Sequence, residues 1–379
     1  MTTTTGAPGT RASAAARTVT ARTAVARTAV AGLAGLVLAG CSTVGTGSAG
    51  EPDGGSDGTA DGGTVTLVTH DSFGLGEEFV TAFEERTGLT LEVVQPGDGG
   101  ALVNQLVLTK DSPIGDAVYG IDNSFASRAI TEGVLAPYTS PELPAGAEQY
   151  AADDEGLLTP VDLGDVCVNV DHEWFAEQGV AEPTTLTDLT DPAYRDLLVV
   201  TNPATSSPGL SFLLATVGAF GEDGWQQYWA DLRDNGVKVV DGWSDAYSVD
   251  FSGSAGEGAR PLVVSYASSP PAEVAEGADE SPTGALLDTC FRQVEYAGVL
   301  AGADNPEGAQ QLVDYLLSPE VQAQVPDAMY MYPVDGSVAL PQSWEQFAPL
   351  APEPFTVAPE TIDAHRDEWI RTWTDTVIG

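Results

Sequence analysis

Residues 64–121 read TVTLVTHDSFGLGEEFVTAFEERTGLTLEVVQPGDGGALVNQLVLTKDSPIGDAVYGI, and this stretch decides the fold class. Runs rich in β-branched residues at 64–69, 91–94 and 117–121 predict strands. Apolar residues recur at helical spacing in the two intervening segments, with Phe79 and Phe83 in the first and Leu102 and Leu106 in the second. Alternating strands and helices predict an α/β fold with a parallel sheet and crossover helices. Ligands gather at the carboxyl ends of such strands, here residues 70–73 and 122–124.

A second α/β unit is expected from about Leu157. Apolar runs at 197–200, 237–240 and 262–264 predict three further strands. A helix is expected after residues 205–209, with Ser207 as its N-cap and Pro208 in its first turn. Two later helices are expected, one from 305–306 to 318–319 and one from about 359 to the end.

The N-terminal segment predicts export and a lipid anchor. Residues 1–40 carry four arginines and no acidic residue before an apolar run, which is typical of a secretory signal. The run ends at Leu38-Ala39-Gly40-Cys41, which resembles a lipoprotein cleavage box in which Cys41 is acylated. The alternative, an uncleaved membrane anchor, would need a longer apolar stretch. Residues 41–63 then predict a lipidated cysteine and a flexible tether. We expect localisation at the cell membrane, lipid-anchored and facing the extracytoplasmic side.

The charge balance excludes several function classes. The chain has 14 Lys and Arg against 56 Asp and Glu, a net charge of −42, which becomes −46 without the four arginines of the signal. Such a surface repels phosphate backbones, so no nucleic acid partner is expected. Only three His and three Cys occur, with no CxxC pair or HExxH string, so no metal site is expected. No cofactor is expected either, since ATP and reduced nicotinamide are not supplied outside the membrane.

The two remaining cysteines predict a disulfide. Cys167 and Cys290 each lie in a strand-like run, 165–170 and 289–294. An even pair in an oxidising compartment favours a bond between them. The alternative is two buried free thiols that act as small hydrophobic side chains.

No catalytic residues are expected. The sequence contains no GxSxG, GxxxxGK[ST] or GxGxxG string, and its three histidines, His70, His172 and His365, have no nucleophile in their local context. A triad can assemble from distant positions, so an extracytoplasmic hydrolase stays open as an alternative.

Aromatic residues stand beside acids and hydroxyls at three predicted strand ends or loops. Trp243 and Tyr247 lie in GWSDAY, Tyr266 in SYASSP, and Tyr330 in YMYP. Aromatic faces attract cations, and nearby carboxylates add charge complementarity. The three segments together favour a site for a flat, positively charged ligand, although Trp243 alone is equally typical of a core residue.

Four polar residues extend this candidate site. Asp71 and Asp122 end two predicted strands, where an Asp is also common as a helix cap or turn former. Ser206 and Ser207 stand at a helix N-terminus, which favours an oxygen or anionic group of a ligand. Plain helix capping is an equal alternative for both serines.

At these residues the chain resembles the thiamine-binding proteins of bacterial thiamine ABC importers. The resemblance covers roughly residues 64–375 and rests on six strings in register, HDSF (70–73), GIDN (120–123), TSSPGL (205–210), GWSDAY (242–247), VSYASSP (264–270) and MYPV (331–334). It implies a two-lobed, type II periplasmic-binding-protein fold with the ligand cleft between the lobes. The first lobe would take residues 64–158 and 292–335, and the second 159–291 and 336–379. The disulfide would then join two strands near the hinge.

The same resemblance implies the ligand, the partners and the contacts. The partners would be thiamine or a thiamine phosphate, an ABC permease and its ATPase subunit, with the lipid anchor as the only membrane contact and a monomeric state. Aromatic residues would flank the thiazolium and pyrimidine rings, an Asp would pair with the aminopyrimidine or the cation, and Ser206 would face the hydroxyethyl or phosphate end. The implied ligand-binding residues are Asp71, Asp122, Ser206, Trp243, Tyr247, Tyr266 and Tyr330.

Four positions depart from the family pattern. His70 stands where the family often has Tyr, Tyr330 where it has Trp, and Ala272 where it has Tyr. A Trp of the family is missing around 75–76. Reduced affinity or broader specificity is the resulting hypothesis.

Three other binding or sensing roles stay open. A polyamine binder of the same fold would need carboxylates at both ends of a long cleft. A ferric-iron binder is less favoured, because no Tyr-Tyr pair occurs. A sensor that presents its ligand-bound form to a receptor cannot be distinguished from an importer by sequence.

Overall fold

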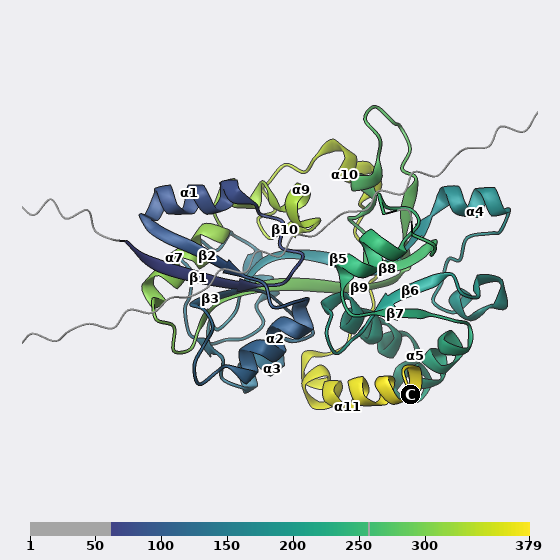
Figure 1. Cartoon of the computed structure of the whole chain (residues 1–379), viewed down its shortest axis with the longest axis horizontal. Helices are drawn as coiled ribbons and strands as arrows, with labels where there is room; N and C mark the ends of the chain where they lie inside the picture. Colours follow the sequence, from purple (N-terminus) through teal and green to yellow (C-terminus); the bar gives the residue numbers. More distant parts are fainter. Residues whose placement is uncertain (1–61, 257) are drawn as a thin grey trace, which may run out of the picture. The chain divides into compact units, whose positions relative to one another are not determined.

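The computed structural model describes residues 62–256 and 258–379. The predicted signal at 1–40, Cys41 and nearly all of the predicted tether therefore lie outside the described residues. Among these residues the strands form one mixed sheet in the order β2-β1-β3-β9-β5-β8-β6-β7, with β10 paired to β5 and β4 to β9 (Figure 1). The α/β class predicted from the sequence is confirmed.

The strands are short except for two. Their bounds are β1 (Gly62–Thr69), β2 (Leu89–Val94), β3 (Ala117–Asp122), β4 (Leu135–Ala136), β5 (Thr159–Asp171), β6 (Leu198–Thr201), β7 (Lys238–Val240), β8 (Leu262–Tyr266), β9 (Thr283–Leu300) and β10 (Tyr332–Pro333). The helices are α1 (Glu77–Thr87), α2 (Gly99–Leu108), α3 (Ala126–Thr131), α4 (His172–Gln178), α5 (Ser207–Asp234), α6 (Trp243–Asp245), α7 (Pro306–Leu316), α8 (Pro319–Gln322), α9 (Val325–Met329), α10 (Gln342–Phe347) and α11 (Pro359–Val377). Single turns lie at η1 (Ala147–Tyr150), η2 (Asp188–Thr190), η3 (Pro192–Tyr194), η4 (Ala246–Asp250) and η5 (Pro270–Glu273).

Two long central strands connect two parallel groups. We call β2, β1 and β3 the first half of the sheet and β8, β6 and β7 the second half; within each group the pairings are parallel, as predicted. The central strands are the exception to the predicted parallel sheet. β5 and β9 run antiparallel to each other along most of their length, and β9 also pairs antiparallel with β3. Hydrophobic periodicity does not distinguish the two orientations for strands buried on both faces, so the sequence could not show this.

The helices cover both faces of the first half of the sheet. Figure 1 shows α1 on one side and α2 and α3 on the other. Phe79 and Phe83, the predicted apolar face of α1, are fully buried, with ring centroids 5.1 and 5.5 Å from that of Tyr315 in α7. In the second half, α11 packs on α5, where the Trp229 and Trp373 rings meet edge to face at 5.4 Å. These contacts hold the helices against the central strands.

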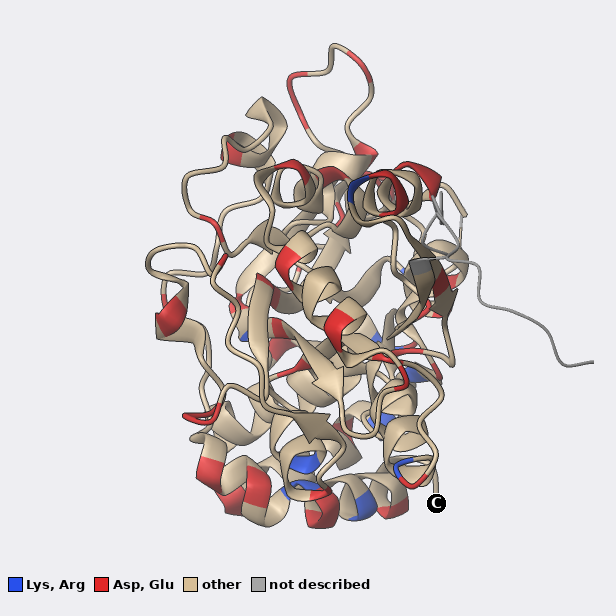
Figure 2. Ribbon diagram, turned by 90° about the vertical axis from the view of Figure 1, so that its left-hand side faces the viewer, with Lys and Arg blue, Asp and Glu red and all other residues tan. Residues whose placement is uncertain are grey.

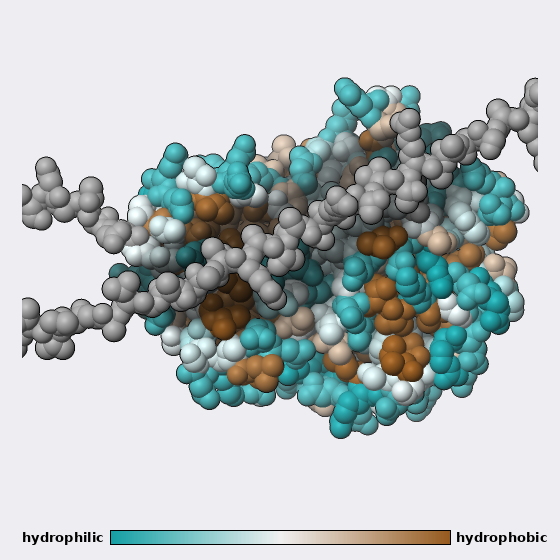
Figure 3. All heavy atoms as spheres, viewed as in Figure 1, coloured by the Kyte–Doolittle hydropathy of each residue, from teal (hydrophilic) through white to brown (hydrophobic). Residues whose placement is uncertain are grey.

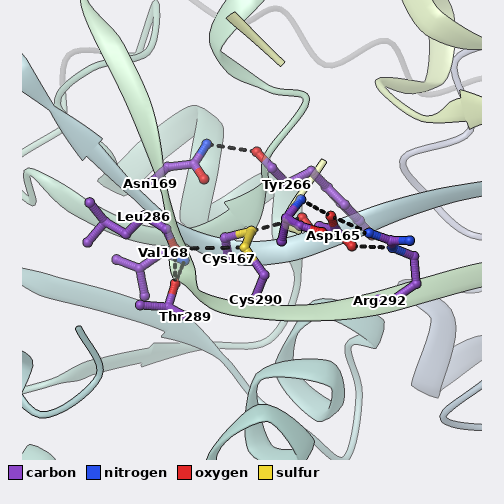
Figure 4. The surroundings of a disulfide bond; sticks show 10 residues. Asp165, Cys167, Val168, Asn169, Tyr266, Leu286, Thr289, Cys290 and Arg292 are labelled. Carbon is purple, nitrogen blue, oxygen red and sulfur yellow. Dashed lines mark hydrogen bonds and ion pairs between the residues drawn. A yellow bond between two sulfur atoms is a disulfide. The ribbon is translucent and has the colours of Figure 1, made fainter. Parts of the chain in front are cut away.

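A disulfide and an ion pair hold the two long strands together (Figure 4). Cys167 of β5 is bonded to Cys290 of β9, and both are fully buried. Two positions along, Arg292 donates to both carboxylate oxygens of Asp165 at 2.5 and 3.0 Å. The backbone N–H of Ala351 donates to the same carboxylate at 2.6 Å. The returning segment after β10 is thereby attached to the centre of the sheet.

The surface is acidic over most of its extent. Figure 2 shows acidic residues spread over helices and loops, whereas the blue segments lie mostly toward the end of the view that carries the C-terminus. On the face in Figure 3, apolar side chains form separate patches among hydrophilic ones. The large apolar side chains classed as exposed are Val93, Val94, Leu108, Val249 and Ile378. Among the described residues, no helix combines the length and apolarity that a membrane span requires.

Candidate functional site

A pocket lies where the ends of elements from both halves of the sheet meet. Its walls come from the end of β1, the start of α2, the starts of α5 and α6, the end of β8, strand β9 and the segment before β10. The lining residues are His70, Ser72, Asp98, Ser207, Pro208, Trp243, Tyr266, Glu295, Met329, Tyr330 and Met331. The pocket thus combines aromatic rings with buried acids.

The aromatic wall is built around Trp243. Its ring lies parallel to that of Tyr247, with centroids 5.0 Å apart and an interplanar angle of 13°. Tyr330 and Tyr266 stand beside it at 6.3 and 6.5 Å. The Trp243 Nε1–H donates to the Ser265 hydroxyl at 2.8 Å, which fixes the orientation of the indole. The wall offers flat, electron-rich faces of the kind that attract a cationic ring.

The wall is held by polar groups behind it. The Tyr247 hydroxyl donates to Glu273 Oε1 at 3.0 Å, and the Ser268 hydroxyl donates to the Tyr330 carbonyl. Tyr330 has φ +54°, a left-handed conformation that is uncommon for a residue other than glycine. Such a conformation persists only where surrounding contacts impose it. The Ser268 hydrogen bond to the Tyr330 carbonyl is one such contact.

Asp98 joins the two halves across the pocket. It is the N-cap of α2, is 8% exposed, and accepts from the Gly99 N–H at 2.6 Å. The same carboxylate accepts the Ser207 N–H at 3.3 Å and the Trp243 N–H at 2.9 Å, both from the second half. Burial raises the pKa of Asp98, while these N–H donors act in the opposite direction. A carboxylate that accepts several N–H groups at helix starts is a strong electrostatic contact.

Two glycines allow this approach. A Cβ at Gly99 would lie 2.0 Å from the Ser207 hydroxyl oxygen, and one at Gly100 would lie 2.7 Å from the Thr205 carbonyl carbon. The Ala101 N–H then donates to the Thr205 carbonyl at 2.9 Å. Gly99 and Gly100 therefore permit a close contact between α2 and the start of α5.

Asp122 lies behind Ser207 and is fully buried. One oxygen accepts the Ser124 N–H at 2.6 Å and the Ser124 hydroxyl, and the other accepts the Ser207 hydroxyl. Burial raises the pKa of Asp122 to about 6 against these hydrogen bonds. The predicted N-cap of α5 is wrong by one position: Ser206 caps the helix through Gly209, because the Ser207 hydroxyl is engaged by Asp122.

An acid-rich group forms the inner end of the pocket. Glu295 is 4% exposed and His70 7%, and both line the pocket, with His70 Nε2 3.7 Å from Glu295 Oε2. Burial lowers the pKa of His70, but the charges of Glu295, Asp98 and Asp71 outweigh this, so its pKa is raised. Asp162 opposes Glu295 on the neighbouring strand and accepts from the Tyr119 hydroxyl. Burial and the Glu295 charge raise the pKa of Asp162 well above its ordinary value.

Three of the seven predicted ligand-binding residues, Trp243, Tyr266 and Tyr330, line the pocket. The others lie around it: Tyr247 is stacked behind Trp243, Ser206 is buried and donates to Thr201, Asp122 lies behind Ser207, and Asp71 is exposed at the rim. Ligand contact by all seven stays a prediction.

Sequence reasoning missed Asp98 and Glu295. Asp98 stands before two glycines at a helix start, a capping pattern that could have indicated it. Glu295 interrupts the apolar run Val294-Glu295-Tyr296, and an acid inside a buried strand could have indicated the site. In the part of the chain that the structure describes, no three His, Cys, Asp or Glu side chains are arranged to hold a metal ion.

Comparisons with known proteins identify the family. Residues 112–351 match the model of the bacterial extracellular solute-binding proteins. The thiamine-binding periplasmic protein of Escherichia coli strain K12 is 30% identical over 320 residues, which cover 82% of this chain and 92% of that protein. The chain belongs to the bacterial extracellular solute-binding proteins. The thiamine-binding periplasmic protein of Brucella suis is 28% identical over 319 residues, covering 82% of this chain and 91% of its own.

Solved structures agree with this assignment. A periplasmic thiamin binding protein aligns with a TM-score of 0.72 at 27% identity, over 83% of this chain and 96% of its own. A ferric binding protein from Campylobacter jejuni aligns with a TM-score of 0.64 at 18% identity, over 82% and 99%, which shows a shared fold alone. This solute-binding protein has the type II periplasmic-binding-protein fold.

Proposed function

We propose that this solute-binding protein captures thiamine outside the cytoplasmic membrane and delivers it to an ABC importer. The observation that carries the proposal is the pocket itself, which combines the Trp243 wall with the buried acids Asp98 and Glu295. Aromatic faces and carboxylates together suit a flat cation such as a thiazolium ring. The thiamine-binding names of the relatives agree with this ligand.

The proposed mechanism is a clamp. The two lobes would be 64–158 with 292–335 and 159–291 with 336–379, connected by β5 and β9. A ligand that touches Trp243 on one lobe and the start of α2 on the other binds the closed form better than the open one, and so shifts the population toward closure. The closed form would dock on an ABC permease, and Cys41 would carry the lipid that keeps the protein at the membrane.

We propose free thiamine as the preferred form over its phosphates. The α5 N-terminus would suit an anion, but its Ser207 N–H already donates to the Asp98 carboxylate. Among the described pocket residues two are carboxylic acids and none is Lys or Arg. A phosphate would therefore meet two carboxylates without a Lys or Arg partner.

Calorimetric titration of the soluble domain with thiamine, thiamine monophosphate and spermidine tests the proposal. We expect saturable one-to-one binding of thiamine with recovery of intact ligand, and weaker binding of the monophosphate. Trp243→Ala should weaken thiamine binding by about 10- to 100-fold, the loss of one stacking partner. Trp174→Ala, a half-buried tryptophan of α4 outside the pocket, is the matched control and should bind as the wild type does. Binding of spermidine alone would refute the ligand, and turnover of the monophosphate would indicate a hydrolase.

A further inference from the structure

Two buried polar atoms face each other in the pocket without hydrogen-bond partners. His70 Nε2 and Glu295 Oε2 are 3.7 Å apart, which is too long for a hydrogen bond between them. Neither atom has a hydrogen-bond partner among the described residues, and both side chains are more than nine-tenths buried. Leaving a buried polar atom without a partner destabilises the ligand-free protein. Both residues line the pocket, so a bound ligand can reach and satisfy them.

The surroundings keep these two atoms available. Gln293 Nε2 donates to Glu295 Oε1 at 2.9 Å and to the Tyr266 hydroxyl at 3.1 Å, which engages the other carboxylate oxygen and leaves Oε2 free. On the other side, Gly120 has φ +97°, and a Cβ there would lie 2.2 Å from His70 Cδ2. Only glycine at this position leaves room for the imidazole ring.

We infer that His70 and Glu295 together read the amino-substituted edge of the ligand's pyrimidine ring. The inference rests on the proposed function and adds which end of thiamine enters the inner pocket. The 4-amino group would donate to Glu295 Oε2, and the adjacent ring nitrogen would accept from His70 Nε2–H. A paired donor and acceptor recognise a ring nitrogen and a nearby amino group in a similar way when Asn or Gln reads N7 and N6 of adenine.

The charges around the pair fit these roles. The raised pKa of His70 favours a proton on its ring, and Asp162, whose pKa is also raised, lies beside Glu295 on the neighbouring strand. Asp98, Asp71 and Tyr119 are the other titratable groups near His70. The pair therefore presents one N–H donor and one carboxylate acceptor. An oxo group in place of the amino group would set an acceptor against Glu295 and leave the carboxylate oxygen unpaired.

The test compares thiamine with oxythiamine, in which an oxo group replaces the 4-amino group, and with pyrithiamine, which keeps the aminopyrimidine but carries a pyridinium. Calorimetry gives the ratio of the oxythiamine Kd to the thiamine Kd for the wild type, Glu295→Gln and His70→Phe. We expect a wild-type ratio on the order of 100, because a site built to bond an amino group rejects an analogue that lacks it. Pyrithiamine should bind within about 10-fold of thiamine, since both inner hydrogen bonds stay.

Glu295→Gln should bring the ratio to about 10 or below, because the amide can donate to the oxo group. The matched control is Glu182→Gln, which alters a second His–Glu pair, His172 and Glu182 at 2.8 Å, remote from the pocket. It should keep the wild-type ratio. His70→Phe is a second test: oxythiamine carries a hydrogen on the ring nitrogen that thiamine offers to His70, so loss of the His70 N–H should weaken thiamine more than oxythiamine and lower the ratio.

Three results would overturn the inference: a wild-type ratio near 1, an unchanged ratio in a folded Glu295→Gln that still binds thiamine, or equal weakening of both ligands in both variants. Each would leave thiamine binding intact as a function. Absence of thiamine binding by the wild type would instead refute the proposed function, and the inference with it.

Discussion

Replacing Asp98 by alanine should weaken thiamine binding by about 100-fold. Its carboxylate accepts N–H groups from Ser207 and Trp243, both in the second half of the sheet. Hydrogen bonds to a charged group contribute about 1.5–3 kcal/mol each, so the loss of two removes at least about 3 kcal/mol from the closed form. The apparent Kd rises in proportion to the fall in the closed population, and 3 kcal/mol corresponds to roughly two powers of ten. Asn at this position should do little better, because its NH2 group would face N–H donors.

The assay pairs calorimetry with small-angle scattering of the ligand-free protein, where a larger radius of gyration reports opening. Asp171→Ala is the matched control. Asp171 is 6% exposed, caps α4 by accepting the Trp174 N–H at 3.0 Å, and lies outside the pocket. Its loss should lower the melting temperature but leave the Kd unchanged. An Asp98→Ala protein that is folded and binds thiamine within about 3-fold of the wild type would refute the reasoning, because the two cross-pocket bonds would then contribute nothing to closure.

Three further predictions concern stability and the site. Replacing Cys167 and Cys290 by alanine should lower the free energy of unfolding in urea by about 3–5 kcal/mol, since the bond closes a loop across 123 positions; a loss under about 1 kcal/mol would contradict this. Because the pKa of Asp122 is raised from 3.8 to about 6, the free energy of unfolding of the wild type should fall as pH rises from about 4.5 to about 7.5. In Asp122→Asn this fall should be smaller by about 2 kcal/mol. Urea titrations of both proteins at the two pH values check this, and parallel pH profiles would refute it. Gly99→Ala should weaken thiamine binding at least 10-fold in calorimetry, because the new Cβ would clash with the Ser207 hydroxyl. Wild-type affinity would contradict this and would mean that α2 can move away from Ser207 without weakening thiamine binding.

Local patterns predicted most of the elements of the fold. α7 and α11 begin within about a residue of the predicted positions, and their starts carry recognisable signals such as Asn305 before Pro306. What the sequence could not supply is long-range pairing. β5 and β9 lie more than a hundred residues apart in the chain, and they pair antiparallel because the chain crosses the sheet in opposite directions in the two strands. The two-lobe boundaries rest on the resemblance and stay a prediction.

The site was predictable where side-chain chemistry is visible in one short string. Trp243 and Tyr266 stand beside hydroxyls and acids within their own segments, so their part in the pocket could be anticipated. Asp122 ends a strand as expected. Its carboxylate accepts a hydrogen bond from the Ser207 hydroxyl, however, and Ser207 lies 85 positions away in the chain. Glu295 is detectable as an acid in a buried strand, but its role could not be assigned from the sequence, because its contacts with His70 and Gln293 form only in the tertiary fold.

The departures from the family pattern fall on two different kinds of position. Ala272 and Gly76 are exposed and Leu75 is buried, and none of the three lines the pocket. His70 and Tyr330 do line it.

Substitutions at the first three positions therefore have no direct route to ligand contact in this arrangement, whereas those at His70 and Tyr330 change the chemistry of the wall. A histidine in place of a tyrosine replaces a hydroxyl beside the aromatic wall with a ring nitrogen that can carry a proton, next to the Glu295 carboxylate. A change in specificity at the inner pocket is then the expected effect of the departures, more than a general loss of affinity.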